Sequence, residues 1–284
     1  MNKIKELKSI ELSSFTIIST AIAVLFSIVS SLLLIIAIGI ASPSAIGVSI
    51  YLVSTIIVGT LMYNIYNAFC QGFLYNLLAK KFNVIQITFK DEKEIVKVSP
   101  ATTAIIVSMI LTIQVILLYL VSVFLLPLLL NAVIQTLMLS GQQILAYSIY
   151  QFLILLSQPA VIAMIIFGTF IVSFVFILLG CYIYNILASS GRGAVVNLSK
   201  ENNYTAIDSV DVKKFTIVIG ILGSILNILS AIISFNGGNL INLVTNIVVG
   251  IVIVFAEAAL IAIFYNFLAP KLGKLKLELI DFTN

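Results

Sequence analysis

The chain contains no histidine among its 284 residues. Imidazole is the usual base in Ser-His-Asp and Cys-His nucleophilic sites, and it holds metal in His-Glu-x-x-His helices and iron in many haem proteins. All of these devices are therefore excluded. Cysteine is also scarce: Cys70 and Cys181 each lie alone inside an apolar run, so neither a Cys-x-x-Cys metal site nor a disulfide framework is indicated. We expect no metal, no cofactor and no enzymatic activity.

Charged residues are also scarce in the chain. Charged residues make up 9% of the sequence and hydrophobic residues 61%, whereas soluble domains have about 25% charged residues. Mean hydropathy is +1.22. This composition predicts an integral membrane protein whose main partner is the lipid bilayer. The net charge of +4 is read as membrane topology, and no nucleic-acid partner is expected.

Six apolar runs are long enough to cross a membrane as helices, which takes about 20 residues. They cover residues 15–40, 50–79, 103–130, 159–188, 215–235 and 240–269. Polar breaks at 41–44 and 236–239 predict tight helical hairpins. An uncharged insert at 131–158 is too short for two more spans, and its part 145–156 predicts a short helix. That helix is either an interfacial cap on the outer side or a re-entrant pore element.

All fifteen basic residues lie away from the hairpin tips and the insert. Under the positive-inside rule, both termini and the connections at 80–102 and 189–214 face the cytoplasm. The sequence therefore predicts a multi-pass protein of the plasma membrane with cytoplasmic N- and C-termini. A cleaved signal peptide is the alternative for the first run, which is longer than the roughly 7–15 apolar residues of such peptides. We expect it to be an uncleaved span.

Self-comparison reveals an internal repeat. Residues Ser9–Ile18 match Ser209–Val218, and 96–102 is a weaker third copy. Three repeats follow: 1–90, 91–200 with the insert 131–158, and 201–284. Each second helix ends in a near-identical Tyr-Asn element: Tyr75-Asn76, Tyr184-Asn185 and Tyr265-Asn266. We expect these pairs to be structural, with Tyr at the headgroup level and Asn bonding carbonyls where its helix ends.

Short alternating segments flank each helical pair and are typical of half-buried strands. Three follow the Tyr-Asn elements, at 85–89, 196–199 and 275–279. Three precede the first helices, marked by the pairs Ile10/Leu12, Val96/Val98 and Val210/Val212. Polar turns at 90–94 and 200–204 join them. Because isolated two-stranded ribbons are marginal in water, the six strands predict one curved sheet or small barrel beneath a pseudo-threefold bundle of helical hairpins.

This unit of strand, two membrane helices, Tyr-Asn-Leu-x-Ala, glycine turn and strand resembles an uncharacterised bacterial family of two-helix transmembrane proteins of unknown function. The resemblance covers nearly the whole chain as three copies. Gly191-Arg192-Gly193 approximates the paired glycines of that family, Gly273 keeps one, and Lys80–Asn83 departs from the pattern with none. The resemblance implies a fold and no activity.

A few polar residues lie inside the apolar runs. Glu257 lies eight residues before Tyr265. This separation is about 12 Å by helical rise, which places Glu257 near mid-membrane. Asn67 occupies the matching position in the first repeat, and Asn246 and Gln114 add amides. Such groups are expensive in lipid and are candidate functional residues. These four form either a polar path in which Glu257 titrates, or interhelical contacts in which a protonated Glu257 bonds a neighbouring helix.

Two functions remain open. The first is a non-enzymatic scaffold whose cytoplasmic β platform binds a cytoplasmic or membrane protein. The second is an ion or small-solute channel or transporter with its path around Glu257.

Overall fold

The computed structural model describes residues 2–282. Strand β1 (Asn2–Ile10) leads into the hairpin of α1 (Leu12–Ala41) and α2 (Ile46–Ala79), joined by the short helix η1 (Pro43–Ala45). Strands β2 (Ile85–Lys90) and β3 (Glu94–Val98) follow. Then come α3 (Pro100–Leu139), α4 (Gln143–Leu156), α5 (Pro159–Leu187) and the π-helical turn η2 (Ala188–Arg192). Strands β4 (Ala194–Glu201) and β5 (Tyr204–Val210), the hairpin of α6 (Val212–Ile233) and α7 (Leu240–Leu272), and β6 (Leu275–Asp281) complete the chain.

Six of these helices are long and apolar enough to cross a membrane: α1, α2, α3, α5 extended through η2, α6 and α7. The six predicted spans are thereby confirmed as helices. The insert prediction needs correction, because α3 continues nine residues past 130, to Leu139, and includes Pro127. The rest of the insert contains the short helix α4, as expected.

The chain divides into two compact units, one of Met1–Thr103 with Leu178–Asn284 and the other of Ala104–Ile177. In the second unit, the hydroxyl of Tyr119 in α3 donates to the carbonyl of Leu156 at the end of α4, at 2.6 Å. The first unit holds all six strands and both short-loop helical hairpins.

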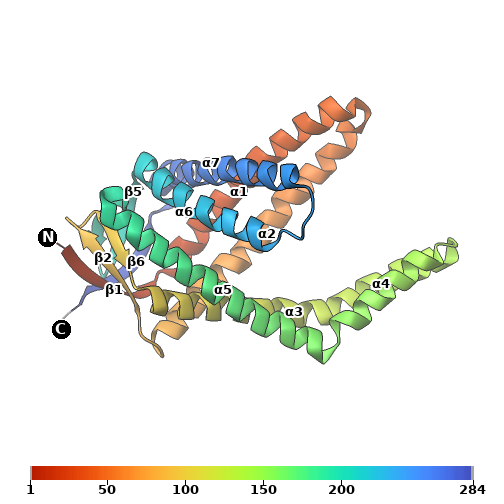
Figure 1. The fold of residues 1–284 in the computed structure, drawn as a ribbon, viewed down its shortest axis with the longest axis horizontal. Coiled ribbons are helices and arrows are strands. Elements are labelled where there is room, and N and C mark those ends of the chain that lie inside the picture. Colours follow the sequence, from red (N-terminus) through yellow and green to blue (C-terminus); the bar gives the residue numbers. More distant parts are fainter. Residues whose placement is uncertain (1, 283–284) are drawn as a thin grey trace. The chain divides into compact units, whose positions relative to one another are not determined.

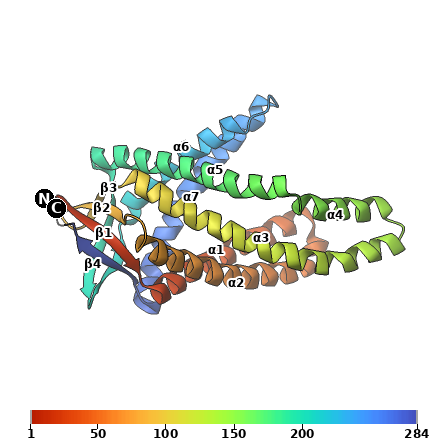
Figure 2. The same ribbon diagram turned by 90° about the horizontal axis from the view of Figure 1, so that it is seen from below.

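The six strands form one closed antiparallel barrel in sequence order (Figures 1 and 2). The predicted sheet or small barrel is therefore a barrel. The turn between β2 and β3 has left-handed backbone at Asp91 (φ 52°) and Glu92 (φ 58°), as a two-residue hairpin turn requires. Most neighbouring strands share several residue pairs, but β3 and β4 share only Glu94–Val195 and Ile95–Ala194.

Two strands end earlier than their alternation suggested. Leu12 and Val212 belong to α1 and α6, not to the strands before them. Glu11 and Asp211 cause the change of backbone direction, because each side chain accepts a hydrogen bond from the N–H three residues on, of Ser14 at 2.7 Å and of Lys214 at 2.9 Å. An acidic N-cap of this kind satisfies a free N–H group at the start of a helix. The helix therefore begins directly after each acid.

The hairpin of α6 and α7 packs closely through glycine. A β-carbon on Gly220 would lie 2.5 Å from the Phe255 ring, and one on Gly223 would lie 2.5 Å from Cγ1 of Val254. Small residues allow two membrane helices to approach at this distance. Outside these contacts about half of the apolar side chains of α7 are exposed, which suits a helix long and apolar enough to cross a membrane.

Candidate functional site

Three tyrosines connect the helices to the barrel at equivalent points. The hydroxyl of Tyr184 in α5 donates to the carbonyl of Ile95 at 2.7 Å and accepts from the N–H of Ala194 at 3.2 Å. Ile95 and Ala194 face each other in the ladder of β3 and β4. One hydroxyl therefore bridges both strands at this joint. Tyr184 is only 8% exposed, so these bonds form away from solvent.

The other two tyrosines repeat this arrangement. Tyr265 in α7 donates to the carbonyl of Ile207 and accepts from the N–H of Leu275, a pair that faces across β5 and β6. Tyr75 in α2 donates to the carbonyl of Leu7 in β1. Burial without a hydrogen-bond partner would cost free energy, and each hydroxyl avoids that cost.

The asparagine after each tyrosine binds one strand residue twice. Asn185 accepts from the N–H of Val98 at 2.8 Å and donates to its carbonyl at 2.9 Å. The same two bonds join the other asparagines to the ends of β1 and β5: Asn76 to Ile10 and Asn266 to Val210. The amide thus supplies a donor and an acceptor to the last residue of each strand, as a neighbouring strand would.

The asparagine contacts differ from those expected, which were carbonyls where its own helix ends. The headgroup level expected of the tyrosine stays a prediction. The observed partners are backbone groups of barrel strands. These strand positions lie 56 to 89 residues away, and a search for local capping motifs does not reach them. The sequence pattern therefore predicts the positions of the pairs but not their partners.

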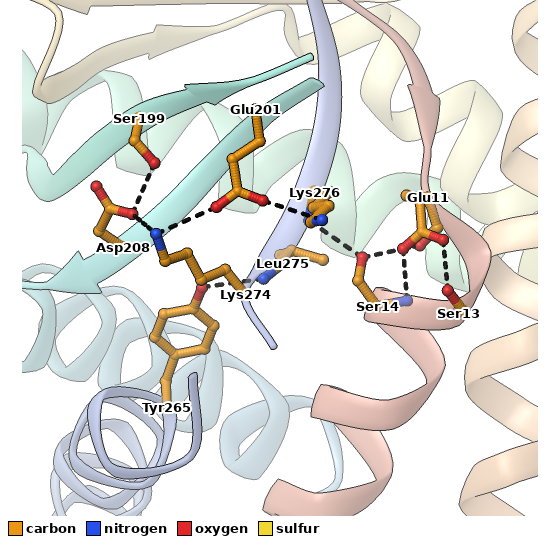
Figure 3. A network of polar contacts seen from close by, with 10 residues as sticks. All are labelled: Glu11, Ser13, Ser14, Ser199, Glu201, Asp208, Tyr265, Lys274, Leu275 and Lys276. Carbon is orange, nitrogen blue, oxygen red and sulfur yellow. Dashed lines mark hydrogen bonds and ion pairs between the residues drawn. The ribbon is translucent and has the colours of Figure 1, made fainter. Parts of the chain in front are cut away.

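A polar network covers one side of the barrel and continues to the start of α1 (Figure 3). Lys274 contacts Asp208 at 2.7 Å and Glu201 at 3.2 Å, and Lys276 contacts Glu201 at 2.9 Å. Beyond these ion pairs, Ser199 donates to Asp208 at 2.7 Å, and the N–H of Lys276 donates to Ser14 at 3.1 Å. The network therefore joins β4, β5, β6 and α1.

Ionisation in this network is shifted toward the charged forms. Hydrogen bonds from Lys276 and Lys274 lower the pKa of Glu201, and those from Lys274 and Ser199 lower the pKa of Asp208. The same carboxylates, Asp208 first, raise the pKa of Lys274. The side chains are about one third exposed, so solvent and salt screen the attraction.

The hairpin turns of the barrel border a small charged cavity. Its volume is about 310 Å³, and it is lined by residues of β1, the β2–β3 turn, β4 and β5, among them Lys5, Lys93, Lys200 and Glu92. Lys3 forms an ion pair with Glu92, and this contact lowers the pKa of Glu92 and raises that of Lys3. Both side chains are about half exposed, so the pair is a weak contributor to stability.

Of the four candidates inside the apolar runs, Glu257, Asn67 and Asn246 belong to the first unit. Glu257 is exposed on α7, and within residues 2–282 no hydrogen bond or ion pair to its carboxyl is present. Asn67 in α2 is half-buried and accepts a hydrogen bond from Gln71 on its own helix, at 3.3 Å. Gln114 is buried but belongs to α3 of the second unit.

Asn246 lies in a different setting. It lines a cavity of about 490 Å³ between α6 and α7, together with Asn227 and Asn242. Glu257 does not line this cavity; it lies eleven residues further along α7, about 16 Å by helical rise. The facing polar residues of α6 were missed as a group, although their spacing at 227, 230 and 234 is that of one helix face.

Within the described part of the chain, no three His, Cys, Asp or Glu side chains come together as a metal site would require. The two cysteines are free thiols. Compared with known proteins, the chain matches no family model, no curated protein sequence and no solved structure.

Proposed function

We propose that the chain is a three-repeat membrane protein with its barrel and both termini in the cytoplasm. Three helical hairpins, related by pseudo-threefold symmetry, would each contribute two strands to the barrel. The three equivalent Tyr-Asn contacts support this arrangement, since each ties the second helix of a hairpin to the strand before the first. The uncharged tips of α1–α2 and α6–α7 support the orientation.

The proposed function is that of a non-enzymatic scaffold in which the barrel is a fixed platform for a cytoplasmic or membrane protein. The observation that carries it is the tethering of the barrel to the helix ends by six side chains. Flexible loops alone would leave the barrel free to rotate against the membrane. Because a closed barrel has no free strand edge, a partner would contact side chains and not add a strand.

Affinity isolation of the full-length protein from its native membranes tests this proposal. Charge reversal at the exposed barrel residues Lys8, Lys97 and Lys200 changes the platform without touching the ion pairs of Figure 3. A partner that binds the platform should co-purify with the wild type and be lost with at least one reversal. Lys80→Glu, just after α2 and outside the barrel, is the matched control. Co-purification that ignores all three reversals would reject the platform.

The second candidate function is a channel or transporter for ions or small solutes. The specific observation in its favour is the polar cavity between α6 and α7, which reaches Asn246 inside the hairpin. Glu257 would supply the titrating group of such a path. Flux into liposomes that contain the purified protein distinguishes this function from the scaffold, which predicts none.

A further inference from the structure

The cavity between α6 and α7 is bordered by two polar helix faces. On α6 these are Asn227 and Ser230 before the capping Ser234, and on α7 they are Asn242 and Asn246 after the capping Asn239. Positions three, four and seven apart share one helix face, so each set is a continuous stripe. Asn227 and Asn246 lie six residues inside their helix ends, about 9 Å deep.

These amides do not hold the hairpin together. Within residues 2–282, no hydrogen bond from a protein group reaches the side chains of Asn227, Asn242 or Asn246. In membrane proteins, paired helix faces of Asn and Ser usually bond each other across the interface. The helices approach each other at Gly220 and Gly223, and the Asn227 side chain packs against Gly250, where a β-carbon would lie 1.9 Å from its Nδ2. Asn242 and Asn246 line the space beside these contacts. Their hydrogen-bonding groups are available to a bound molecule.

The lining selects the charge of that molecule. Among the described residues no acidic or basic side chain borders the cavity, so an ion would find no counter-charge there. The start of α7 would favour an anion, but Asn239 already accepts from the N–H of Ile241 at 2.8 Å. A neutral molecule is therefore favoured.

The lining also selects the polar groups of the ligand. Each asparagine amide both donates and accepts, and so does each serine, which is the pattern that matches a hydroxyl group. The side of Phe235 adds one aromatic surface to this polar lining. A volume of 490 Å³ corresponds to about 16 water molecules, and it falls within the usual range of ligand sites.

We propose that the α6–α7 cavity binds a neutral polyhydroxylated group, a sugar ring or polyol, through the amides of Asn227, Asn242 and Asn246. The group would come either from a free sugar or from the headgroup of a neutral glycolipid. This site is separate from the barrel platform, and only the side of the membrane from which the ligand arrives depends on the proposed orientation.

The absence of tryptophan from the chain provides a test. Phe235→Trp places one fluorophore at the cavity, and Phe82→Trp places one after α2 as the control reporter. The full-length reporter protein, in phosphatidylcholine nanodiscs, is titrated with maltose and separately prepared with monoglucosyl diacylglycerol in the bilayer. We expect a saturable change in emission of the Phe235→Trp reporter and none of the Phe82→Trp reporter. A response to maltose identifies a free sugar, and a response to the glycolipid alone identifies a headgroup.

Substitution of the amides checks the site itself. Asn242→Leu with Asn246→Leu should weaken binding at least tenfold in the Phe235→Trp background. Asn64→Leu is the matched control, because the Asn64 amide donates to the carbonyl of Thr60 on its own helix, at 2.9 Å. Binding that survives the double substitution would overturn the proposal. So would a response to NaCl or KCl instead of the sugars, or no response to any of these probes.

Discussion

The hydroxyl of Tyr184 donates to the carbonyl of Ile95 at 2.7 Å, at the joint where the barrel has only two residue pairs between its strands. The N–H of Ala194 donates to the same hydroxyl. Gly193 lies next to this joint, where a β-carbon would stand 2.5 Å from the Ile95 carbonyl oxygen. Closure of the barrel between β3 and β4 therefore depends on a side chain from α5 as well as on backbone pairing.

Tyr184→Phe should destabilise the protein by about 1–3 kcal/mol, because it leaves two buried backbone groups without their partner. Hydrogen exchange should accelerate in β3 and β4 before it does in β5 and β6, which share three pairs. Tyr182→Phe on the same helix is the control, since Tyr182 is 54% exposed. Thermal unfolding in detergent measures the difference. Equal stability of the two variants would show that the hydroxyl is dispensable.

The ion pairs of Lys274 should make the stability of the protein depend on pH in the acidic range. The pKa values of Asp208 and Glu201 are lowered in the folded protein, so their contribution is present above the unfolded pKa values of about 4 and is lost as pH falls through the lowered values. Melting temperature should therefore fall below about pH 4, and salt should weaken the effect.

Lys274→Gln tests which residue causes this dependence. It removes the first cause of the lowered Asp208 pKa, so the melting temperature should vary less with pH below about 4. Lys97→Gln, at an exposed position of β3, is the matched control and should keep the wild-type pH profile. Identical profiles for both variants would mean that the network contributes nothing measurable.

Gly220→Ala should destabilise the α6–α7 hairpin by about 1–3 kcal/mol, because the new methyl group would overlap the Phe255 ring. Gly59→Ala in α2 is the control: nothing lies within 4 Å of its β-carbon position, and alanine favours the helix. The two substitutions should thus change the melting temperature in opposite directions. A stabilising Gly220→Ala would show that α6 and α7 do not pack this closely in the membrane.

Cysteine labelling tests the proposed orientation. In a background without Cys70 and Cys181, cysteines at Ser44, Gln143 and Gly238 should react with an impermeant reagent from outside. Cysteines at Asn83 and Asn203 should react only after the membrane is opened. Asn83 and Asn203 lie in the connections that carry basic residues, whereas Ser44, Gln143 and Gly238 lie in uncharged segments. The positive-inside rule therefore assigns the first two to the cytoplasm. External labelling at Asn83 or Asn203 would reverse or reject the topology.

The sequence was sufficient for the parts of the fold that depend on local periodicity. Six helices and six strands follow from runs of apolar residues and from alternation such as that of 275–279. Ring closure between β3 and β4 was not derivable, because it depends on Tyr184 meeting Ile95 in β3, 89 residues away. The start of α1 at Leu12 was missed for a simpler reason: alternation continues through Glu11, and only its capping contact with Ser14 ends the strand.

The candidate site was less predictable. Glu257 is conspicuous in sequence because it is an acid in an apolar helix, yet the structure leaves it exposed. The asparagines of α6 and α7 are individually ordinary. Their significance arises only when two helices place the stripes face to face, and that pairing is a property of the tertiary structure.

Glu257 discriminates between its two proposed roles. If Glu257 is an interhelical hydrogen-bonding group, Glu257→Leu should lower the stability of the protein by about 1–2 kcal/mol. Glu257→Gln should then leave the stability unchanged. The structure gives the carboxyl an exposed position without a partner within residues 2–282. We therefore expect Glu257→Leu to keep or raise the melting temperature, because it replaces an unpaired ionisable group on an apolar helix. A drop of several degrees with Leu but not with Gln would restore the interhelical role.

The transport role predicts a different effect of substitutions at Glu257. If Glu257 titrates along a path, Glu257→Gln should abolish a pH-dependent flux in liposomes and leave the protein folded, because the substitution removes the exchangeable proton. Asn242→Leu with Asn246→Leu should reduce that flux as well if the α6–α7 cavity opens onto the path. We expect no flux from the wild type, since Glu257 lies about 16 Å beyond the cavity and the glycine contacts of Gly220 and Gly223 close the hairpin between them. A current in the wild type that Glu257→Gln eliminates would replace the scaffold with a transporter.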